Sequence, residues 1–198
     1  MKEILVTGGA GYIGSVIVDL LVKKKHKVVV VDNLSTGHRS LINPGVIFYK
    51  ESILNTKKIE KIFYSHNIDT VIHLAGLSLI GESNKKKKLY SKNNITGGIN
   101  ILKTMVKTGC KKIIFSSSAS VYGRPKYTPL DEKHAIKPIS FYGKTKAVFE
   151  EKLKYFNKRH GINSLSLRYF NAGGSFNGYG EMHATETHLI PSVLKRLK

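Results

Sequence analysis

Short apolar runs rich in valine and isoleucine recur along the chain and alternate with segments of helical periodicity. The runs cover residues 3–7, 27–32, 46–50, 69–75, 112–118 and 164–170. Because their apolar residues stand at consecutive positions, they are predicted to be strands buried on both faces of a sheet. The segments with apolar residues at helical spacing cover 12–24, 55–66, about 85–108 and 143–160.

This alternation predicts an α/β fold, a doubly wound parallel sheet with right-handed crossovers and helices on both faces. The helix at 143–160 offers a stripe predicted to be buried, made of Ala147, Phe149, Leu153 and Phe156. Beyond residue 171 the chain becomes rich in glycine and asparagine, and a short apolar helix is expected from about 189 to the end. We therefore expect one domain over 1–170 and only the beginning of a second region over 171–198.

Composition and charge limit the functional classes. The formal net charge is +20, which invites a nucleic-acid interpretation because basic patches bind phosphate. However, only five of the 33 basic residues are arginine, the side chain that pairs bidentately with phosphate and base edges. A bias toward lysine codons explains the pattern, so no specific nucleic-acid partner is expected.

Cysteine use and hydropathy indicate the compartment. Cys110 is the single cysteine, so an intramolecular disulfide or a thiolate metal cluster is not expected. No apolar run reaches the roughly 18 residues that cross a bilayer, and Asp19 interrupts the first apolar helix. We expect a cytoplasmic protein with no membrane partner and no metal.

The glycines after the first strand carry the first chemical signal. Gly8, Gly11 and Gly14 lie three residues apart where the first strand meets the first helix. Such glycines allow a tight turn, a close approach of the backbone to a pyrophosphate, and close packing of helix on sheet. Asp32 ends the second strand, at the offset where an acid accepts hydrogen bonds from the adenosine ribose and repels a 2′-phosphate. The pattern predicts a Rossmann domain that binds NAD rather than NADP.

The glycine spacing resembles that of the short-chain dehydrogenase/reductase superfamily, in which a Tyr-x-x-x-Lys pair and an upstream serine transfer protons. Two such pairs exist here, Tyr122/Lys126 and Tyr142/Lys146. The first pair flanks a glycine and a proline, where a helix is not expected. The second opens a long predicted helix, so its side chains share one face. Ser118, at the end of the fifth strand, is the predicted catalytic hydroxyl, while Ser116 and Ser117 could satisfy backbone groups.

Six motifs in order, TGGAGYIGS, DNLSTG, HLAGLSLIGES, SSSASVYG, YGKTK and RYFNAGG, resemble the UDP-glucose 4-epimerase family of extended short-chain dehydrogenases. The resemblance implies a tightly held NAD that takes a hydride from C4 of a UDP-hexose and returns it to the other face. It implies that Tyr142 is the base, that Lys146 lowers the pKa of this tyrosine and holds the nicotinamide ribose, and that Ser118 hydrogen-bonds the sugar O4.

By the same resemblance, further positions are expected to bind ligands. The cofactor would contact Gly8, Gly11, Tyr12, Ile13, Gly14, Asp32, Asn33, Ser35, Gly37, Leu74, Ala75, Gly76, Asn93, Ser116, Tyr142, Lys146 and Phe170. The UDP-sugar would contact Ser118, Tyr142, Asn171, His188 and Leu189. Members of the family commonly form homodimers through the helices that correspond to 85–108 and 143–160.

Alternatives remain. A nucleotide-sugar 4,6-dehydratase would need an acid pair after the catalytic hydroxyl, where this chain has Ala119 and Ser120. Family members also continue for more than a hundred residues, so the chain could be a truncated or split NAD-binding part without turnover. Ser52 and Ser78 depart from the family pattern, and the adenine contact usual at Ser52 could pass to Glu51.

Overall fold

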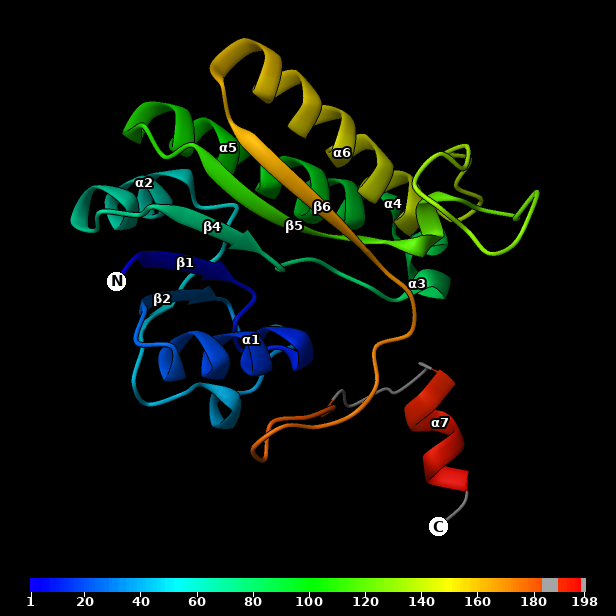
Figure 1. Cartoon of the computed structure of the whole chain (residues 1–198), viewed down its shortest axis with the longest axis horizontal. Coiled ribbons are helices and arrows are strands. Elements are labelled where there is room, and N and C mark those ends of the chain that lie inside the picture. The colour runs from blue at the N-terminus through cyan, green and yellow to red at the C-terminus, as the bar shows by residue number, and fades with distance from the viewer. Residues whose placement is uncertain (183–188, 197–198) are drawn as a thin grey trace.

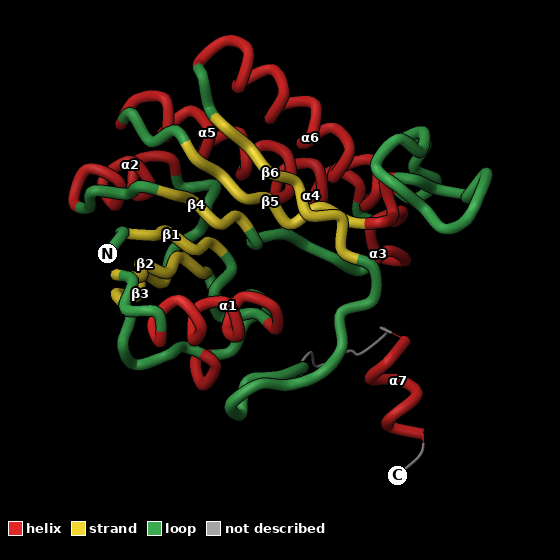
Figure 2. The backbone as a smooth tube through the Cα atoms, viewed as in Figure 1, coloured by secondary structure: helices red, strands yellow, loops and turns green. Residues whose placement is uncertain are grey.

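The chain folds into one parallel sheet flanked by helices. The computed structural model describes residues 1–182 and 189–196. The strands are β1 (Glu3–Thr7), β2 (Lys27–Asp32), β3 (Ile47–Lys50), β4 (Thr70–His73), β5 (Lys112–Ser118) and β6 (Asn163–Tyr169). They pair in parallel in the order β3-β2-β1-β4-β5-β6 (Figure 1; β3 is labelled in Figure 2). The order reverses between β1 and β4, which creates a crevice at the carboxyl ends of these two strands.

Helices cover both sides of this sheet. They are α1 (Tyr12–Lys23), α2 (Thr56–Ser65), α3 (Ile80–Lys85), α4 (Lys87–Tyr90), α5 (Gly97–Thr108), α6 (Phe141–His160) and α7 (Leu189–Arg196), with short turns η1 (Arg39–Leu41), η2 (Ser91–Thr96) and η3 (Ala119–Val121). Helix α1 lies on one side of the sheet, and α2, α5 and α6 lie on the other (Figure 2). The predicted doubly wound α/β fold is confirmed.

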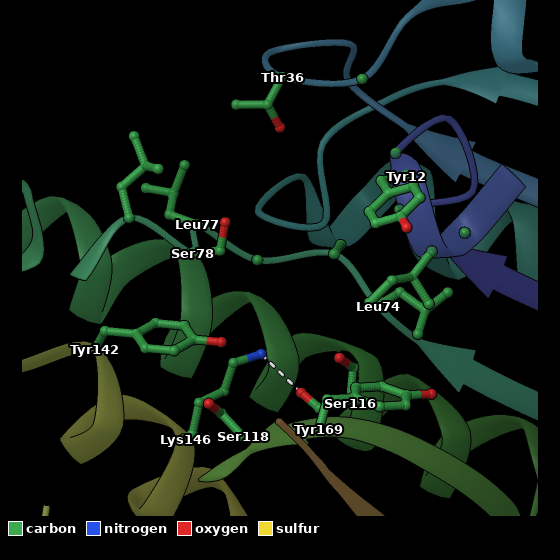
Figure 3. Close-up of a pocket in the computed structure, with 18 of the residues that line it drawn as sticks. Tyr12, Thr36, Leu74, Leu77, Ser78, Ser116, Ser118, Tyr142, Lys146 and Tyr169 are labelled. Carbon is green, nitrogen blue, oxygen red and sulfur yellow. Dashed lines mark hydrogen bonds between the residues drawn. The ribbon is translucent and has the colours of Figure 1, made fainter. Parts of the chain in front are cut away.

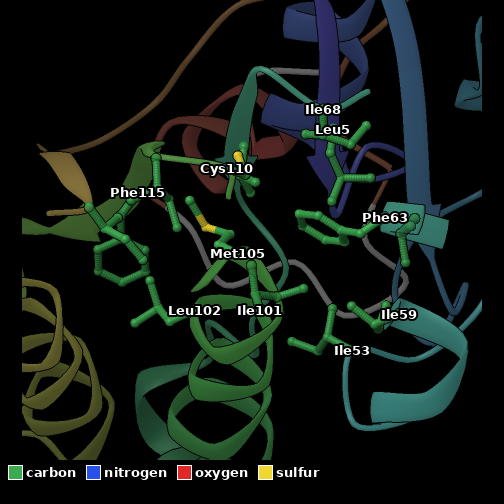
Figure 4. Close-up of a cluster of buried hydrophobic side chains, with 14 of the residues drawn as sticks. Leu5, Ile53, Ile59, Phe63, Ile68, Ile101, Leu102, Met105, Cys110 and Phe115 are labelled. Atoms are coloured by element: carbon green, nitrogen blue, oxygen red, sulfur yellow. The ribbon is translucent and has the colours of Figure 1, made fainter. Parts of the chain in front are cut away.

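Two apolar cores follow from consecutive apolar positions in the strands. Leu5, Val29 and Val31 belong to the larger core with residues of α2, α5 and α6. Figure 4 shows Leu5 among Ile59 and Phe63 of α2 and Ile101 and Met105 of α5. Their neighbours Ile4 and Val30 face the other core, with α1. The predicted stripe of α6, Ala147, Phe149, Leu153 and Phe156, is buried. Burial of both faces therefore holds for β1 and β2.

The two edge strands depart from this expectation. Ile47 in β3 is 37% exposed and Leu165 in β6 is 55% exposed. At these outermost strands, consecutive apolar residues therefore do not predict burial of both faces.

The helix predicted at about 85–108 is also different in the structure. It begins earlier, at Ile80, breaks at Lys86, and contains a π-helical stretch over Ser91–Thr96 before α5. The Tyr90 hydroxyl bonds the Leu79 carbonyl, and the Asn94 amide bonds both the Leu77 backbone and the Thr145 hydroxyl. The π-helical stretch occurs where these bonds hold the buried side chains of Tyr90 and Asn94 inward.

After β6 the chain runs back along α1. The Tyr12 hydroxyl donates to the Gly174 carbonyl at 2.7 Å, and the Asn177 amide donates to Asp19 at 2.8 Å. The division into a domain over 1–170 and a second region over 171–198 stays a prediction. No helix within the described residues is long and apolar enough to cross a membrane.

Candidate functional site

A cavity of about 460 Å³ opens at the carboxyl ends of the strands, at the switch point between β1 and β4 (Figure 3). It brings together residues that are far apart in the sequence. Every predicted cofactor position lies in its lining: Gly8, Gly11, Tyr12, Ile13, Gly14, Asp32, Asn33, Ser35, Gly37, Leu74, Ala75, Gly76, Asn93, Ser116, Tyr142, Lys146 and Phe170. Ser118 and Asn171 line it as well.

The three glycines are needed for different reasons. Gly8 has a positive φ of 76°, and a Cβ there would lie 2.6 Å from the Ala75 nitrogen of the next loop. A Cβ on Gly14 would lie 2.1 Å from the Gly8 carbonyl oxygen, so helix and loop touch directly. Gly11 is the N-cap of α1, and because it has no side chain, no side-chain hydrogen bond caps the helix. The first N–H groups of a helix have no partner within it, so this end of α1 can accept a phosphate.

Asp32 is held rigidly beside this turn. Its two carboxylate oxygens accept the N–H groups of Ala10 at 3.0 Å and Leu34 at 2.8 Å. The side chain is 7% exposed, and each oxygen retains a lone pair for a further donor. Asn33, Ser35 and Gly37, which follow Asp32 in the chain, also line the cavity. This edge therefore offers polar groups of the kind that the hydroxyls of a ribose would need.

The far end of this wall follows β3. Glu51 and Ile53 line the cavity, whereas Ser52 does not appear in its lining. The Ser52 hydroxyl instead accepts the N–H of Leu54 at 3.2 Å. A purine attached to a ribose at Asp32 would meet a carboxylate and an apolar side chain here.

Lys146 and Tyr142 face the cavity from the first turns of α6. The Lys146 ammonium donates to the Ser116 carbonyl at 2.7 Å and lies 5.6 Å from the centre of the Tyr142 ring. The two side chains share a helix face, as the spacing predicts. Burial lowers the pKa of Lys146 to about 8. Burial also raises the pKa of the Tyr142 phenol, and the nearby Ser118 hydroxyl offsets part of this rise.

The other Tyr-x-x-x-Lys pair, Tyr122 and Lys126, does not share a helix face. Tyr122 follows the short turn η3 and is 4% exposed, and its hydroxyl accepts the Arg168 guanidinium at 3.0 Å. Lys126 lies in the following loop, where its backbone N–H donates to His134. The expectation that Tyr122 and Lys126 are not on one helix is met.

The serines at the end of β5 have separate contacts. The Ser118 oxygen accepts the N–H of Ser120 at 3.1 Å and the side chain lines the cavity. The Ser117 hydroxyl points to the opposite face of the sheet and donates to Glu150 at 2.5 Å. It therefore bonds a side chain, whereas a bond to a backbone group was expected. Ser116 contributes its carbonyl oxygen to Lys146. The alternation of a strand explains why adjacent serines differ.

Sequence reasoning missed a buried network below this site. Glu150, one turn after Lys146 on α6, accepts two bonds from Arg168 of β6, at 3.0 and 2.7 Å. His73 is also buried, and its Nδ1 lies 2.7 Å from the Thr7 hydroxyl. Burial, with the Lys146 charge, lowers the pKa of His73 to about 3, so this ring is neutral. The spacing of Glu150 four residues after Lys146 places both on one face of the helix, but it does not identify Arg168 as the partner of Glu150.

The predicted positions at the end of the chain are partly described. Phe170 and Asn171 line the cavity, and so does Ile190 of α7. Leu189 is the first residue of α7. His188 lies outside the described residues, so its predicted contact stays a prediction.

The chain matches, over residues 4–198, the family model described as NAD dependent epimerase/dehydratase. It belongs to this family. NAD, the cofactor predicted from the glycines and Asp32, is thus the cofactor of the family. The glycine cradle, the open N-terminus of α1 and the fixed Asp32 fit this cofactor in the structure itself.

The family members most similar in sequence include UDP-glucose 4-epimerases. That of Lactobacillus helveticus is 47% identical over 195 residues, which cover 98% of this chain and 59% of that protein. That of Halalkalibacterium halodurans is 44% identical over 194 residues, with coverages of 97% and 58%. The chain spans about three-fifths of the length of these relatives.

Solved structures agree. The UDP-glucose 4-epimerase of Brucella ovis in complex with NAD superposes with a TM-score of 0.94 at 38% identity, covering 97% of this chain and 59% of that one. The enzyme of Thermotoga maritima with UDP-glucose gives 0.86 at 39% identity, covering 88% and 57%. The resemblance stated from the motifs is therefore confirmed.

Proposed function

We propose that this chain binds NAD at the switch point and supplies the proton-transfer groups for epimerisation at C4 of UDP-glucose and UDP-galactose. The observation that carries the proposal is that the dinucleotide cradle and the Tyr142/Lys146 pair line a single cavity. A hydride acceptor and a proton acceptor can then act on the same carbon and its hydroxyl. The similarity to UDP-glucose 4-epimerases supports this choice of substrate.

The cofactor would lie along the wall already described. The first turn of α1, with Gly11, Tyr12 and Ile13, would bind the pyrophosphate through backbone N–H groups. Asp32 would accept the ribose hydroxyls, and Glu51 would accept the adenine amino group in place of Ser52. Leu74, Ala75, Gly76 and Asn93 would line the nicotinamide half.

NAD would supply the chemistry of a hydride acceptor that returns the hydride to the opposite face of the sugar. Tyr142, as phenolate, would remove the proton from the sugar O4 and later return it. Ser118 would hydrogen-bond the same oxygen and relay its proton. Lys146, held by the Ser116 carbonyl, would hold the nicotinamide ribose and keep a positive charge near the phenol.

The protonation states limit this chemistry. Burial raises the pKa of Tyr142, so in the free chain the phenol keeps its proton near pH 7. A positive charge close to the ring favours the phenolate, and the Lys146 ammonium is the protein group placed to provide it. Lys146, with a pKa lowered to about 8, is still mostly charged at pH 7. Loss of this charge should therefore impair Tyr142 at alkaline pH.

A 4,6-dehydratase is less well supported. Elimination needs an acid beside the catalytic hydroxyl, and the cavity has Ala119 and Ser120 at that place. Glu82 also lines the cavity, but its carboxylate bonds the Lys86 ammonium and the Tyr90 hydroxyl at 2.8 and 2.9 Å. Epimerisation requires no such acid.

Asn171 would contact the UDP-sugar, and His188 and Leu189 are further predicted contacts. Pairing of two copies through the helices near 85–108 and 143–160 also stays a proposal. Tyr155 of α6, 59% exposed, and Leu89 of α4, 46% exposed, offer apolar surface on these helices.

The test is to incubate the purified chain with UDP-galactose and to measure UDP-glucose by chromatography, while acid releases bound nucleotide from the same sample. We expect bound NAD and conversion that is lost in Tyr142→Phe. Tyr155→Phe, on the exposed face of the same helix, is the control that keeps activity. Bound NAD without conversion would mark the chain as a cofactor-binding part that does not turn over sugar alone, and absence of bound NAD would refute the proposal.

A further inference from the structure

The N-terminus of α6, which carries Tyr142, has unusually complete hydrogen bonding. The first N–H groups of a helix have no acceptor within the helix. Ser140 is the N-cap, and its hydroxyl accepts the N–H of Gly143 at 3.0 Å. Its carbonyl accepts Lys144 at 3.0 Å, the first backbone bond of the helix. Two N–H groups, those of Phe141 and Tyr142, need acceptors from elsewhere.

Both acceptors come from α3, almost 60 residues earlier in the chain. The Ser83 hydroxyl oxygen accepts the Tyr142 N–H at 2.9 Å, and the Asn84 side-chain oxygen accepts the Phe141 N–H at 2.9 Å. Ser83 is completely buried and donates its own proton to the Ile80 carbonyl at 2.6 Å. That donation directs a lone pair of the Ser83 oxygen toward Tyr142.

Helices α1 and α6 both begin at the cavity, and their N-termini differ. Helix α1 begins at Gly11 without a side-chain cap, which leaves its N–H groups for a phosphate. Helix α6 begins with its first three N–H groups bonded to side chains. The N–H groups of α6 are therefore used for position and not for ligand binding.

Helix α3 is itself anchored at the cavity. Ile80 and Glu82 belong to its lining. Helix α3 therefore forms part of the cavity wall and also caps the N-terminus of α6. The Glu82 carboxylate is held by Lys86 at 2.8 Å and by the hydroxyl of the buried Tyr90 at 2.9 Å. A wall held in this way gives Ser83 and Asn84 fixed positions from which to bond α6.

We propose that Ser83 and Asn84 are positioning residues that cap α6 from α3 and thereby hold the Tyr142 phenol at its place in the cavity. The proposal rests on the proposed role of Tyr142 as the base. It assigns no contact with substrate or cofactor to Ser83 or Asn84. Their effect passes through the backbone of Tyr142 to its side chain.

The experiment measures the pKa of the Tyr142 phenol in the chain without added cofactor or sugar. The chain is labelled with ¹³C at tyrosine Cζ, Tyr142→Phe assigns the resonance, and pH titration gives its pKa. The phenol of the wild type should titrate above the ordinary value near 10, because it is buried. Ser83→Ala and Asn84→Ala should shift the titration of Tyr142 downward as its ring gains solvent. The conservative Ser83→Thr and Asn84→Asp, which retain the acceptor oxygen, should restore it.

A second measurement guards against loss of folding in Ser83→Ala. Asn84 is exposed, so its variants should fold. Its side-chain oxygen accepts the Phe141 N–H, so the Phe141 amide should exchange about 2- to 30-fold faster in Asn84→Ala, the range expected for loss of a helix cap. Thr104→Val is the control, because Thr104 is a buried hydroxyl in α5 that bonds only within its own helix. An unchanged titration in both alanine variants, or an equal shift in Thr104→Val, overturns the proposal. Since no cofactor or sugar is added, a failure of NAD binding would refute the proposed function and leave this result intact.

Discussion

Removing the Glu150 carboxylate should destabilise the chain strongly, because three elements meet at it. Its Oε1 accepts Ser117 of β5 at 2.5 Å and the Arg168 Nε of β6 at 3.0 Å, while Oε2 accepts the Arg168 Nη2 at 2.7 Å. Glu150 itself lies on α6 and is 4% exposed. In Glu150→Ala the Arg168 guanidinium, whose side chain is 17% exposed, loses its counter-charge.

The magnitude follows from this burial. Removing one partner of a buried ion pair costs about 3–5 kcal/mol, mainly because the other charge stays buried. For a chain of this size, each kcal/mol lowers Tm by about 2–4 °C. Glu150→Ala should therefore lower Tm by about 6–20 °C.

The assays are thermal unfolding, which gives Tm, and urea unfolding, which gives the free energy of unfolding, both monitored by circular dichroism at neutral pH. Glu151→Ala is the matched control, since Glu151 is the next residue of α6 and is exposed. Its free energy of unfolding should stay within about 0.5 kcal/mol of the wild type. A loss below about 1 kcal/mol in Glu150→Ala would refute the argument that this pair ties α6 to β5 and β6.

The same pair predicts a pH dependence. Burial opposes ionisation of Glu150, but the bonds from Arg168 and Ser117 outweigh it and lower its pKa below the ordinary 4.5. A carboxyl with a lowered folded pKa stabilises the chain above its unfolded pKa, and this contribution is lost as the pH falls through the folded value. The difference in stability between the wild type and Glu150→Ala should therefore shrink in acid.

Three further predictions concern the cavity. Tyr142→Phe should retain NAD and lower any turnover by about 10²- to 10⁴-fold, as loss of an acid–base group does, and a fully active variant would place the base elsewhere. Asp32→Ala should weaken NAD binding, measured by calorimetry, about 10- to 100-fold, because hydrogen bonds to a charged group contribute about 1.5–3 kcal/mol. It should also relax the preference for NAD over NADP. Unchanged selectivity would mean that other groups recognise the ribose. Gly14→Ala should lower the free energy of unfolding by about 1–3 kcal/mol or more, since its Cβ would lie 2.1 Å from the Gly8 oxygen. Gly81→Ala, whose Cβ would meet nothing within 4 Å beyond its chain neighbours and its own helix backbone, should be nearly neutral. Equal effects would contradict the steric argument.

The order of the elements and the cavity wall could be predicted because the signals are local. Runs of valine and isoleucine locate the strands to within one or two residues. The glycines of the turn after β1 are predictable too, because a side chain at Gly8 or Gly14 would collide with neighbouring backbone atoms. The i, i+4 spacing of Tyr142 and Lys146 needs only a helix. These features depend on neighbours in sequence, so periodicity and spacing reveal them.

The features that sequence reasoning missed depend on tertiary contacts. The break at Lys86 and the π-helical stretch arise where Tyr90 and Asn94 bond residues outside their own helix. The pairing of Glu150 with Arg168 requires that β6 lie beside β5 and below α6. No spacing in the sequence reports such a contact, because its partners belong to separate elements.

The positions of Tyr142 and Lys146, the proposed proton-transfer groups, are thus fixed by contacts at both ends of one segment of α6. Ser83 and Asn84 hold the backbone at Tyr142, the Ser116 carbonyl holds the Lys146 ammonium, and Glu150 fastens the next turn of α6 to the sheet. All of these contacts lie between residues 83 and 168. The chain therefore contains within itself the parts that place Tyr142 and Lys146, although it spans about three-fifths of the length of its relatives. Activity that is lost while the Tyr142 titration stays unchanged would then report on ligand binding, not on the position of the proposed base.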